Sequence, residues 1–413
     1  MAIVLAYAIV ELSSAATFWW AHGRGFSFAE LAAARREARL GRPADELTQV
    51  DGADRDPGGW TFEDSILHPY LGYARQPADE VQTFYGFPTT AEPASAADDV
   101  FVVGITGGSV GELFYRWATR ERTWEEQLRR LPSLRDARIE YVHLGLRGYK
   151  QPQQLLATAY YLALGGRLDL LVALDGFNEL SLAGELYESG VFPAYPYHWR
   201  ALSAPQSDAR GLRSLARVLG LREARSRWAG VAERLRFSVT AGTVWSLVDA
   251  RLARQIAAEA SGAARQPGDF PYFRNGPAFA GDQAGFVDFA TRLWTRSSTQ
   301  LDALAQRHGF AYFHFLQPNL NVEGSKPLSL REQELLLPGS AHQRFAERGY
   351  PALREAGQEL AGAGVHFVDL TQVFADVEQT LYMDGCCHFF DPGNEIVGRE
   401  MVRAFEQAGV FSE

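Results

Sequence analysis

Five short apolar runs, rich in β-branched and aromatic residues, follow one another from residue 100 onward. They occupy residues 100–106, 139–146, 168–176, 311–317 and 365–371. Most are separated by segments in which apolar residues recur at helical spacing, namely 123–131, 153–164 and 286–309. Near-continuous apolar strands that alternate with amphipathic helices are typical of a parallel sheet covered on both faces. The pattern therefore predicts an α/β core built from residues 98–180 and 285–413.

The interval 181–284 interrupts this pattern. It opens with an aromatic segment at 192–202 and continues with an arginine-rich stretch of helical character over 208–260. A structureless loop of this length is improbable inside a compact domain, so we expect a mainly helical insert. Its arginines are typical of a solvated helix face.

The N-terminal region combines an apolar start with a polar continuation. Residues 2–10 are apolar, Glu11 follows, and Trp19 and Trp20 come before the first basic residue. A spanning helix needs about 20 mostly apolar residues, with aromatic residues at its interfaces. We expect residues 1–22 to anchor the protein in a membrane. This anchor would place the rest of the chain outside the bacterial cytoplasm, in the cell envelope. The alternative is a buried or interfacial helix, which Glu11 favours.

Residues 23–97 form an N-terminal extension to the predicted core. Residues 27–41 have the apolar spacing of an amphipathic helix, and residues 60–98 are aromatic and loop-like.

Composition narrows the class of partner. The chain has 413 residues, is 46% hydrophobic, and carries a net charge of −10. This acidity argues against a nucleic-acid partner, because phosphate binding needs a concentrated positive surface. The two lysines, Lys150 and Lys326, stand among 40 basic residues, which we interpret as a reflection of genome composition. The two cysteines, Cys386 and Cys387, are adjacent and cannot form an ordinary disulfide framework, so they leave the redox compartment open.

Candidate site residues lie at or beyond the ends of four of the predicted strands. Ligands of parallel α/β sheets bind outside the carboxyl ends of the strands. Ser109 lies in a Gly-rich turn after the first strand, Gly145 lies at the end of the second, Asn178 follows the third, and His388 comes after the last. A serine needs an adjacent base to act as a nucleophile, and His388 can supply it. The backbone N–H groups of Ser109 and Gly145 and the amide of Asn178 can stabilise an oxyanion.

This set of segments resembles the SGNH (GDSL-like) hydrolase superfamily. "ITGGSV" resembles its Ser block, "LGLRGY" its Gly block, "DGFNE" its Asn block, and "DGCCHFFDPGN" its Asp-x-x-His block. Glu179 stands where the Asn block usually has Asp. The resemblance implies a flavodoxin-like, three-layer α/β/α sandwich with a five-stranded parallel sheet. It further implies hydrolysis of small-molecule or glycan esters through an acyl-serine intermediate, without a metal or organic cofactor.

The acid of the Asp-x-x-His block is displaced in this chain. Three residues before His388 stands Gly385, and Asp384 is four residues before it. We expect a one-residue bulge to bring Asp384 to His388 Nδ1, so that it orients the ring. A backbone carbonyl is the alternative. Asp391, followed by Pro392, is interpreted as a helix N-cap.

Each candidate residue also has a structural interpretation. Ser109 is typical of a turn, Asn178 of a helix cap, and His388 of a buried histidine with satisfied hydrogen bonds. Cys386, Cys387 and His388 contain metal-ligating groups, but no second ligand cluster accompanies them in the sequence, which disfavours zinc.

Three alternative functions remain open at this point. Residues 107–111 also satisfy the Gly-x-Ser-x-Gly elbow of α/β-hydrolases, although several strands precede the elbow in that fold. The same Ser and His could transfer an acyl group to a glycan, as an O-acyltransferase does. The chain could also be a noncatalytic binding or assembly protein. The sequence leaves the oligomeric state open.

Overall fold

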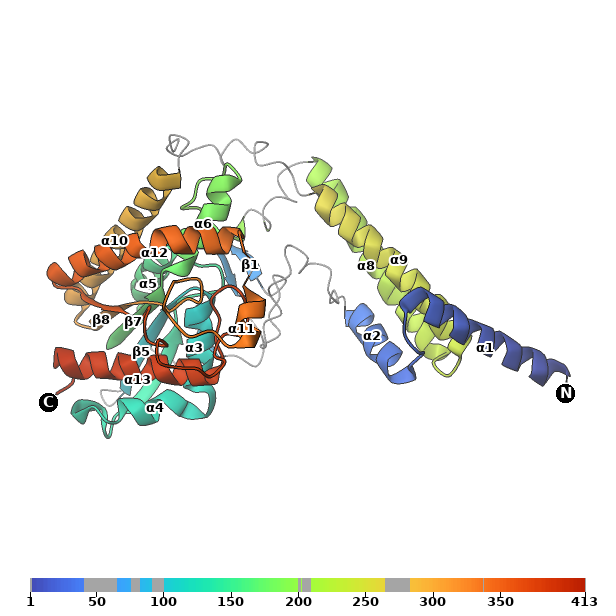
Figure 1. Ribbon diagram of the computed structural model, residues 1–413, viewed down its shortest axis with the longest axis horizontal. Coiled ribbons are helices and arrows are strands. Elements are labelled where there is room, and N and C mark those ends of the chain that lie inside the picture. The colour runs from blue at the N-terminus through green and yellow to red at the C-terminus, as the bar shows by residue number, and fades with distance from the viewer. Residues whose placement is uncertain are drawn as a thin grey trace. The chain divides into compact units, whose positions relative to one another are not determined.

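The computed structural model describes residues 2–40, 65–75, 82–90, 100–199, 202, 209–263, 283–336 and 338–412 (Figure 1). The chain divides into two compact units. The first contains residues 1–55 and 203–266, and the second contains residues 56–202 and 267–413.

A five-stranded parallel sheet forms the centre of the second unit. Its strands are β5 (Val100–Gly107), β6 (Arg138–His143), β7 (Leu170–Asp175), β8 (Ala311–Leu316) and β9 (His366–Asp369). They lie in the order β6-β5-β7-β8-β9, and every neighbouring pair is parallel. All residues of β7 are buried, as expected for a strand covered on both faces. The predicted five-stranded α/β core is confirmed.

Helices cover both faces of this sheet (Figure 1). One group consists of α3 (Ser109–Thr119), α4 (Thr123–Leu128) and α13 (Asp391–Ala408), which contact one another. The other consists of α5 (Gln153–Ala163), α6 (Phe177–Glu188), α10 (Gln283–His308) and α12 (Ala341–Gly362). A short helix, α11 (Leu330–Leu335), and two 3₁₀ turns, Arg120–Arg122 and Pro132–Leu134, also belong to this unit. The arrangement is compatible with a three-layer α/β/α fold.

The strand order determines where a site can lie. The first strand of the sheet, β5, lies between the second, β6, and the third, β7. The chain goes from β5 to β6 on one side and then crosses to β7 on the other, and ligands of open α/β sheets bind at the carboxyl ends of the strands where the strand order reverses in this way. The segments after β5, β6 and β7 are those that carry Ser109, Gly145 and Asn178.

Two short hairpins lie in the region predicted to be loop-like. Strands β1 (Ser65–His68) and β2 (Gly72–Arg75) pair antiparallel, as do β3 (Thr83–Phe84) and β4 (Phe87–Pro88). Tyr73, Phe84 and Phe87 are buried in the main core. The loop prediction is wrong here because these aromatic side chains pack against the core, which the local pattern does not reveal. The rest of the predicted region 60–98 lies outside the described residues.

Four helices make up the described part of the first unit. They are α1 (Ala2–His22), α2 (Phe28–Leu40), α8 (Ala209–Arg234) and α9 (Val239–Ala263). The two long helices α8 and α9 occupy the interval in which the sequence indicates a helical insert. Phe18, Leu31 and Trp245 are buried together, so α1 and α2 share one hydrophobic core with α8 and α9. The sequence pattern does not indicate this grouping, because the two segments are far apart along the chain.

The expected membrane anchor over residues 1–22 is not found. Among the described helices, none combines the length and the apolar character that crossing a bilayer requires. Glu11 lies in the middle of α1, and its carboxylate accepts hydrogen bonds from Ser238 Oγ, at 2.7 Å, and from the N–H of Val239. The acid therefore binds the N-terminus of α9, where a negative charge is favourable.

Candidate active site

Ser109, His388 and Asp384 form a continuous chain of hydrogen bonds. Ser109 is the first residue of α3, directly after the turn that ends β5. His388 and Asp384 lie in the loop before α13. The distance from His388 Nε2 to Ser109 Oγ is 2.6 Å, and His388 Nδ1 is hydrogen-bonded to Asp384 Oδ2. Residues separated by 279 positions thus meet at the carboxyl edge of the sheet.

The loop around Asp384 explains the displaced acid. Its Oδ1 atom accepts hydrogen bonds from the N–H groups of Cys386, Cys387 and His388, at 3.0, 3.1 and 3.2 Å. The chain wraps around the carboxylate, and the extra residue is taken up in that turn. Gly385 fits there because a Cβ atom would lie 2.1 Å from Leu335 O. The structure thus brings Asp384 to His388 as the sequence predicts, with no backbone carbonyl in its place.

The charge of Asp384 fixes the tautomer of His388. Burial by itself raises the pKa of Asp384, but the charge of His388 and the hydrogen bonds from His388 and Cys387 lower this pKa below its ordinary value. An ionised carboxylate only accepts hydrogen bonds, so His388 Nδ1 carries the proton and Nε2 presents its lone pair to Ser109. This is the arrangement that a base needs.

The three predicted oxyanion donors lie around the Ser109 turn. A Cβ atom on Gly108 would lie 2.0 Å from Asn178 Nδ2, and one on Gly145 would lie 2.3 Å from Gly107 O. The segments after β5, β6 and β7 therefore touch one another. The N–H of Ser109 belongs to the first turn of a helix, where N–H groups have no partner within the helix.

Asn178 does not cap the following helix. Helix α6 begins at Phe177, and its N-cap is Gly176. Asn178 Nδ2 donates a hydrogen bond to Tyr149 O at 2.8 Å, which aligns the amide. An amide nitrogen carries two hydrogens, so one remains to be directed at a ligand.

Glu179, which replaces the usual Asp, connects two of the site segments. One of its oxygens accepts hydrogen bonds from Gln151 N and Gln154 Nε2, both at 3.0 Å, and the other accepts from Gly176 N at 2.9 Å. Burial, with the charge of Asp175 as a smaller cause, raises the pKa of Glu179. The longer side chain thus reaches the segment after β6 and holds it against α6.

Both lysines brace loops around the site, which sequence reasoning missed. Lys150 is buried and donates to the carbonyls of Pro193 and Tyr195. Burial lowers its pKa to about 7, against the opposing charge of Glu179. Lys326 binds Glu332, and both side chains are fully buried. The signal in the sequence that could have indicated them is the rarity of lysine, which occurs only at these two positions among 40 basic residues.

Glu332 supports the loop that carries Asp384 and His388. Besides Lys326, its carboxylate accepts the N–H groups of Leu381 and Tyr382, at 2.8 and 2.9 Å. Met383 N donates to His388 O at 3.0 Å and closes the base of the loop.

The first hairpin supports the segment after β6. Tyr149 Oη donates to Tyr73 O at 2.7 Å, and Tyr73 Oη donates to Arg147 O at 2.9 Å. Glu112 of α3 accepts the N–H of Arg147 at 3.2 Å. Gly145 is therefore followed by a segment that is held from two directions.

Asp391 lies outside the triad and is not a cap. It is the first residue of α13, whose N-cap is Phe390, and it forms an exposed ion pair with Arg120 at 2.6 Å. The N-cap interpretation is wrong because the helix begins one residue earlier, although Pro392 does occupy its first turn.

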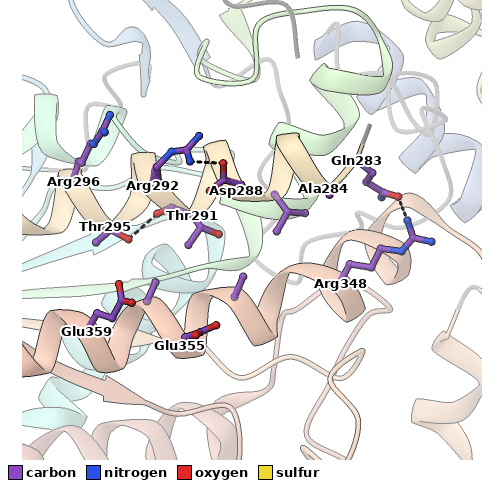
Figure 2. Close-up of a pocket in the computed structure, with 13 residues that line it drawn as sticks. Gln283, Ala284, Asp288, Thr291, Arg292, Thr295, Arg296, Arg348, Glu355 and Glu359 are labelled. Atoms are coloured by element: carbon purple, nitrogen blue, oxygen red, sulfur yellow. Dashed lines mark hydrogen bonds and ion pairs between the residues drawn. The ribbon is translucent and has the colours of Figure 1, made fainter. Parts of the chain in front are cut away.

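The cavity between α10 and α12 is separate from these residues (Figure 2). It measures about 690 Å³, and charged side chains of both signs line it, including Asp288, Arg292, Arg348 and Glu355. None of the lining residues belongs to the Ser109 site.

No protein-family model matches the chain, and no curated protein matches it significantly. The geometry of the site is therefore the basis on which a function is assigned.

Proposed function

We propose that the chain is a serine ester hydrolase of the SGNH type. The observation that carries this proposal is the hydrogen-bonded chain from Ser109 through His388 to Asp384. The position of these three hydrogen-bonded residues supports the proposal, because they lie where ligands bind in parallel α/β sheets. The order of the Ser, Gly, Asn and His segments supports the assignment to this type.

In the proposed reaction, Ser109 Oγ attacks the carbonyl carbon of an ester. His388 Nε2 takes the hydroxyl proton, and the positive ring is stabilised by the Asp384 carboxylate. The carbonyl π-electrons move to oxygen, which the N–H groups of Ser109 and Gly145 and the amide of Asn178 stabilise. His388 then protonates the departing alcohol as the ester bond breaks, which leaves an acyl-serine.

Water completes the cycle. His388 removes a proton from the water that attacks the acyl-serine, and it returns that proton to Ser109 Oγ as the acid is released. No step needs a metal ion or an organic cofactor. The proposed substrates are esters of small molecules or of glycans.

Reaction with a fluorophosphonate and turnover of p-nitrophenyl esters of increasing acyl length test the proposal. Ser109→Ala should abolish labelling and lower turnover by roughly 10⁴–10⁶-fold. Its fold should remain, because one hydroxyl hydrogen bond contributes only about 1 kcal/mol. Ser412→Ala is the matched control, because Ser412 is exposed and bonds only locally to Gly409.

Unchanged hydrolysis by pure Ser109→Ala protein would contradict the proposal. If a glycan acceptor is added and acylated glycan accumulates in place of free acid, the same site acts as an acyltransferase.

A further inference from the structure

The two cysteines of the chain lie in contact beside the proposed active site. Cys386 and Cys387 have exposed fractions of 9% and 1%, and their Sγ atoms are 2.7 Å apart. Both thiols therefore point to the same side of the loop. They belong to the five-residue segment that begins with Asp384 and ends with His388.

The peptide between the two cysteines is held at both ends. Its carbonyl, that of Cys386, accepts a hydrogen bond from Asn319 Nδ2 at 2.8 Å, and Asn319 is fully buried. Its N–H, that of Cys387, donates to Asp384 Oδ1 at 3.1 Å. A rotation of this peptide would therefore move the carboxylate that orients His388.

Metal binding explains the cluster less well than thiol chemistry. The potential ligand atoms of Cys386, Cys387 and His388 lie within 4.8 Å of one another. However, one ring nitrogen of His388 is bonded to Ser109 and the other to Asp384, so a metal would have to displace one of them. In the described part of the chain, this cluster includes no fourth ligand, whereas structural zinc takes four.

We propose that Cys386 and Cys387 are a redox modification site, which closes to a vicinal disulfide and turns the active site off. This inference rests on the proposed hydrolase function. Cys386 is the more exposed thiol, and a peroxide is the oxidant. The Cys386 sulfur attacks one peroxide oxygen, the O–O bond breaks, and the products are a sulfenic acid and one water.

The second thiol completes the oxidation. The Cys387 sulfur attacks the sulfenic sulfur, the S–S bond forms, the S–O bond breaks, and a second water leaves with the thiol proton. Two electrons from the two thiols thus reduce one peroxide to two waters. A reduced dithiol reverses the change by thiol–disulfide exchange and is itself oxidised to a disulfide.

Closure strains the loop because the cysteines are neighbours. Adjacent Cα atoms are about 3.8 Å apart, whereas disulfides usually join Cα atoms about 4.4–6.8 Å apart. The new ring includes the peptide between the cysteines, so this peptide must twist away from Asn319 or from Asp384. Strained disulfides are the more easily reduced ones, as a reversible modification requires.

The test uses the full chain, first reduced and then treated with hydrogen peroxide. Intact mass reports whether two hydrogens are lost, and turnover of a p-nitrophenyl ester is measured on the same sample. We expect both hydrogens to be lost and turnover to fall roughly 10²-fold, which is the cost of about 1 Å of misplacement of a catalytic group. Dithiothreitol should restore both the mass and the turnover.

The matched control is Cys386→Ser combined with Cys387→Ser. It keeps the backbone donors to Asp384 and lacks both thiols, so its turnover after peroxide should equal its own turnover before peroxide. If the control is inactivated to the same extent, oxidation elsewhere is responsible and the switch is refuted.

The remaining outcomes separate the switch from the hydrolase. A mass without the loss of two hydrogens refutes the disulfide, and a disulfide with unchanged turnover refutes its effect. If the reduced protein neither hydrolyses esters nor reacts with a fluorophosphonate at Ser109, the hydrolase is refuted and the switch with it. In that case the mass still reports whether the disulfide forms.

Discussion

Replacing Asp384 by asparagine tests how the proposed base is oriented. In the native loop one oxygen of Asp384 accepts three N–H groups and the other is bonded to His388 Nδ1. Asparagine offers only one oxygen, and three donors compete for it. Its NH₂ group is then left facing His388 Nδ1, which favours the tautomer that carries the proton on Nε2. In this tautomer the ring cannot accept the proton of Ser109.

Rate and stability should respond very differently to this change. In a Ser-His-Asp triad, the acid-to-amide change costs roughly 10⁴-fold in kcat, so we expect a loss of this order. The fold loses one charge-assisted hydrogen bond, which is worth about 1.5–3 kcal/mol, while the three backbone bonds are kept. The free energy of unfolding should therefore fall modestly while catalysis nearly disappears.

The assay is kcat on one p-nitrophenyl ester, with denaturant unfolding of the same preparations. Asp391→Asn is the matched control, because Asp391 is exposed and its ion pair with Arg120 is worth about 0–1 kcal/mol. A folded Asp384→Asn protein with kcat within about tenfold of the native value would refute the orienting role. A large loss at Asp391 with little at Asp384 would place the acid on the other side of His388.

Four further predictions follow from the surroundings of individual residues. Asn178→Ala should lower kcat roughly 10²–10³-fold, the cost of one oxyanion donor, and an unchanged kcat would rule that role out. Gly108→Ala places a Cβ atom 2.0 Å from Asn178 Nδ2, so kcat should fall and stability should drop by about 1–3 kcal/mol. Gly230→Ala, in α8, meets nothing within 4 Å and should stabilise by about 0.5–1 kcal/mol in the same unfolding assay. Burial by itself raises the pKa of Glu332, but hydrogen bonds from Tyr382 and Lys326 outweigh it and lower this pKa from 4.5 to about 2. The contribution of Glu332 to the free energy of unfolding is therefore complete above pH 4.5 and is lost as the pH falls toward 2. The Tm of Glu332→Gln should consequently depend less on pH in that range, and parallel Tm curves for the variant and the native protein would contradict this.

The sheet could be predicted from the sequence because its strands are apolar on both faces. Runs such as that of β7, buried at every position, are visible without knowledge of their neighbours. The hairpin strand β2 is only four residues long, and the burial of Tyr73 depends on Tyr149, which lies 76 positions away. No local pattern carries that information. The shared core of α1, α2, α8 and α9 was missed for the same reason.

The residues of the candidate site could be predicted from the sequence, but the contacts that hold them in place could not. Ser109, Asn178 and His388 stand out because each follows a strand or a glycine turn. The position of Asp384 depends on three N–H groups that converge on one oxygen, which becomes evident only in the folded loop. The burial of Lys150 and Lys326 could not be predicted, because nothing adjacent to them in the sequence indicates it.

The first unit has a consequence for how the protein is made. Glu11 binds the start of α9, which lies 228 residues later in the chain. At about 5–20 residues per second, translation needs roughly 10–50 s to produce that partner. Throughout this time the apolar positions of α1 and α2, such as Phe18 and Leu31, lack the part of their native surroundings that α8 and α9 supply. The nascent chain therefore exposes apolar side chains of α1 and α2 until α8 and α9 have emerged from the ribosome.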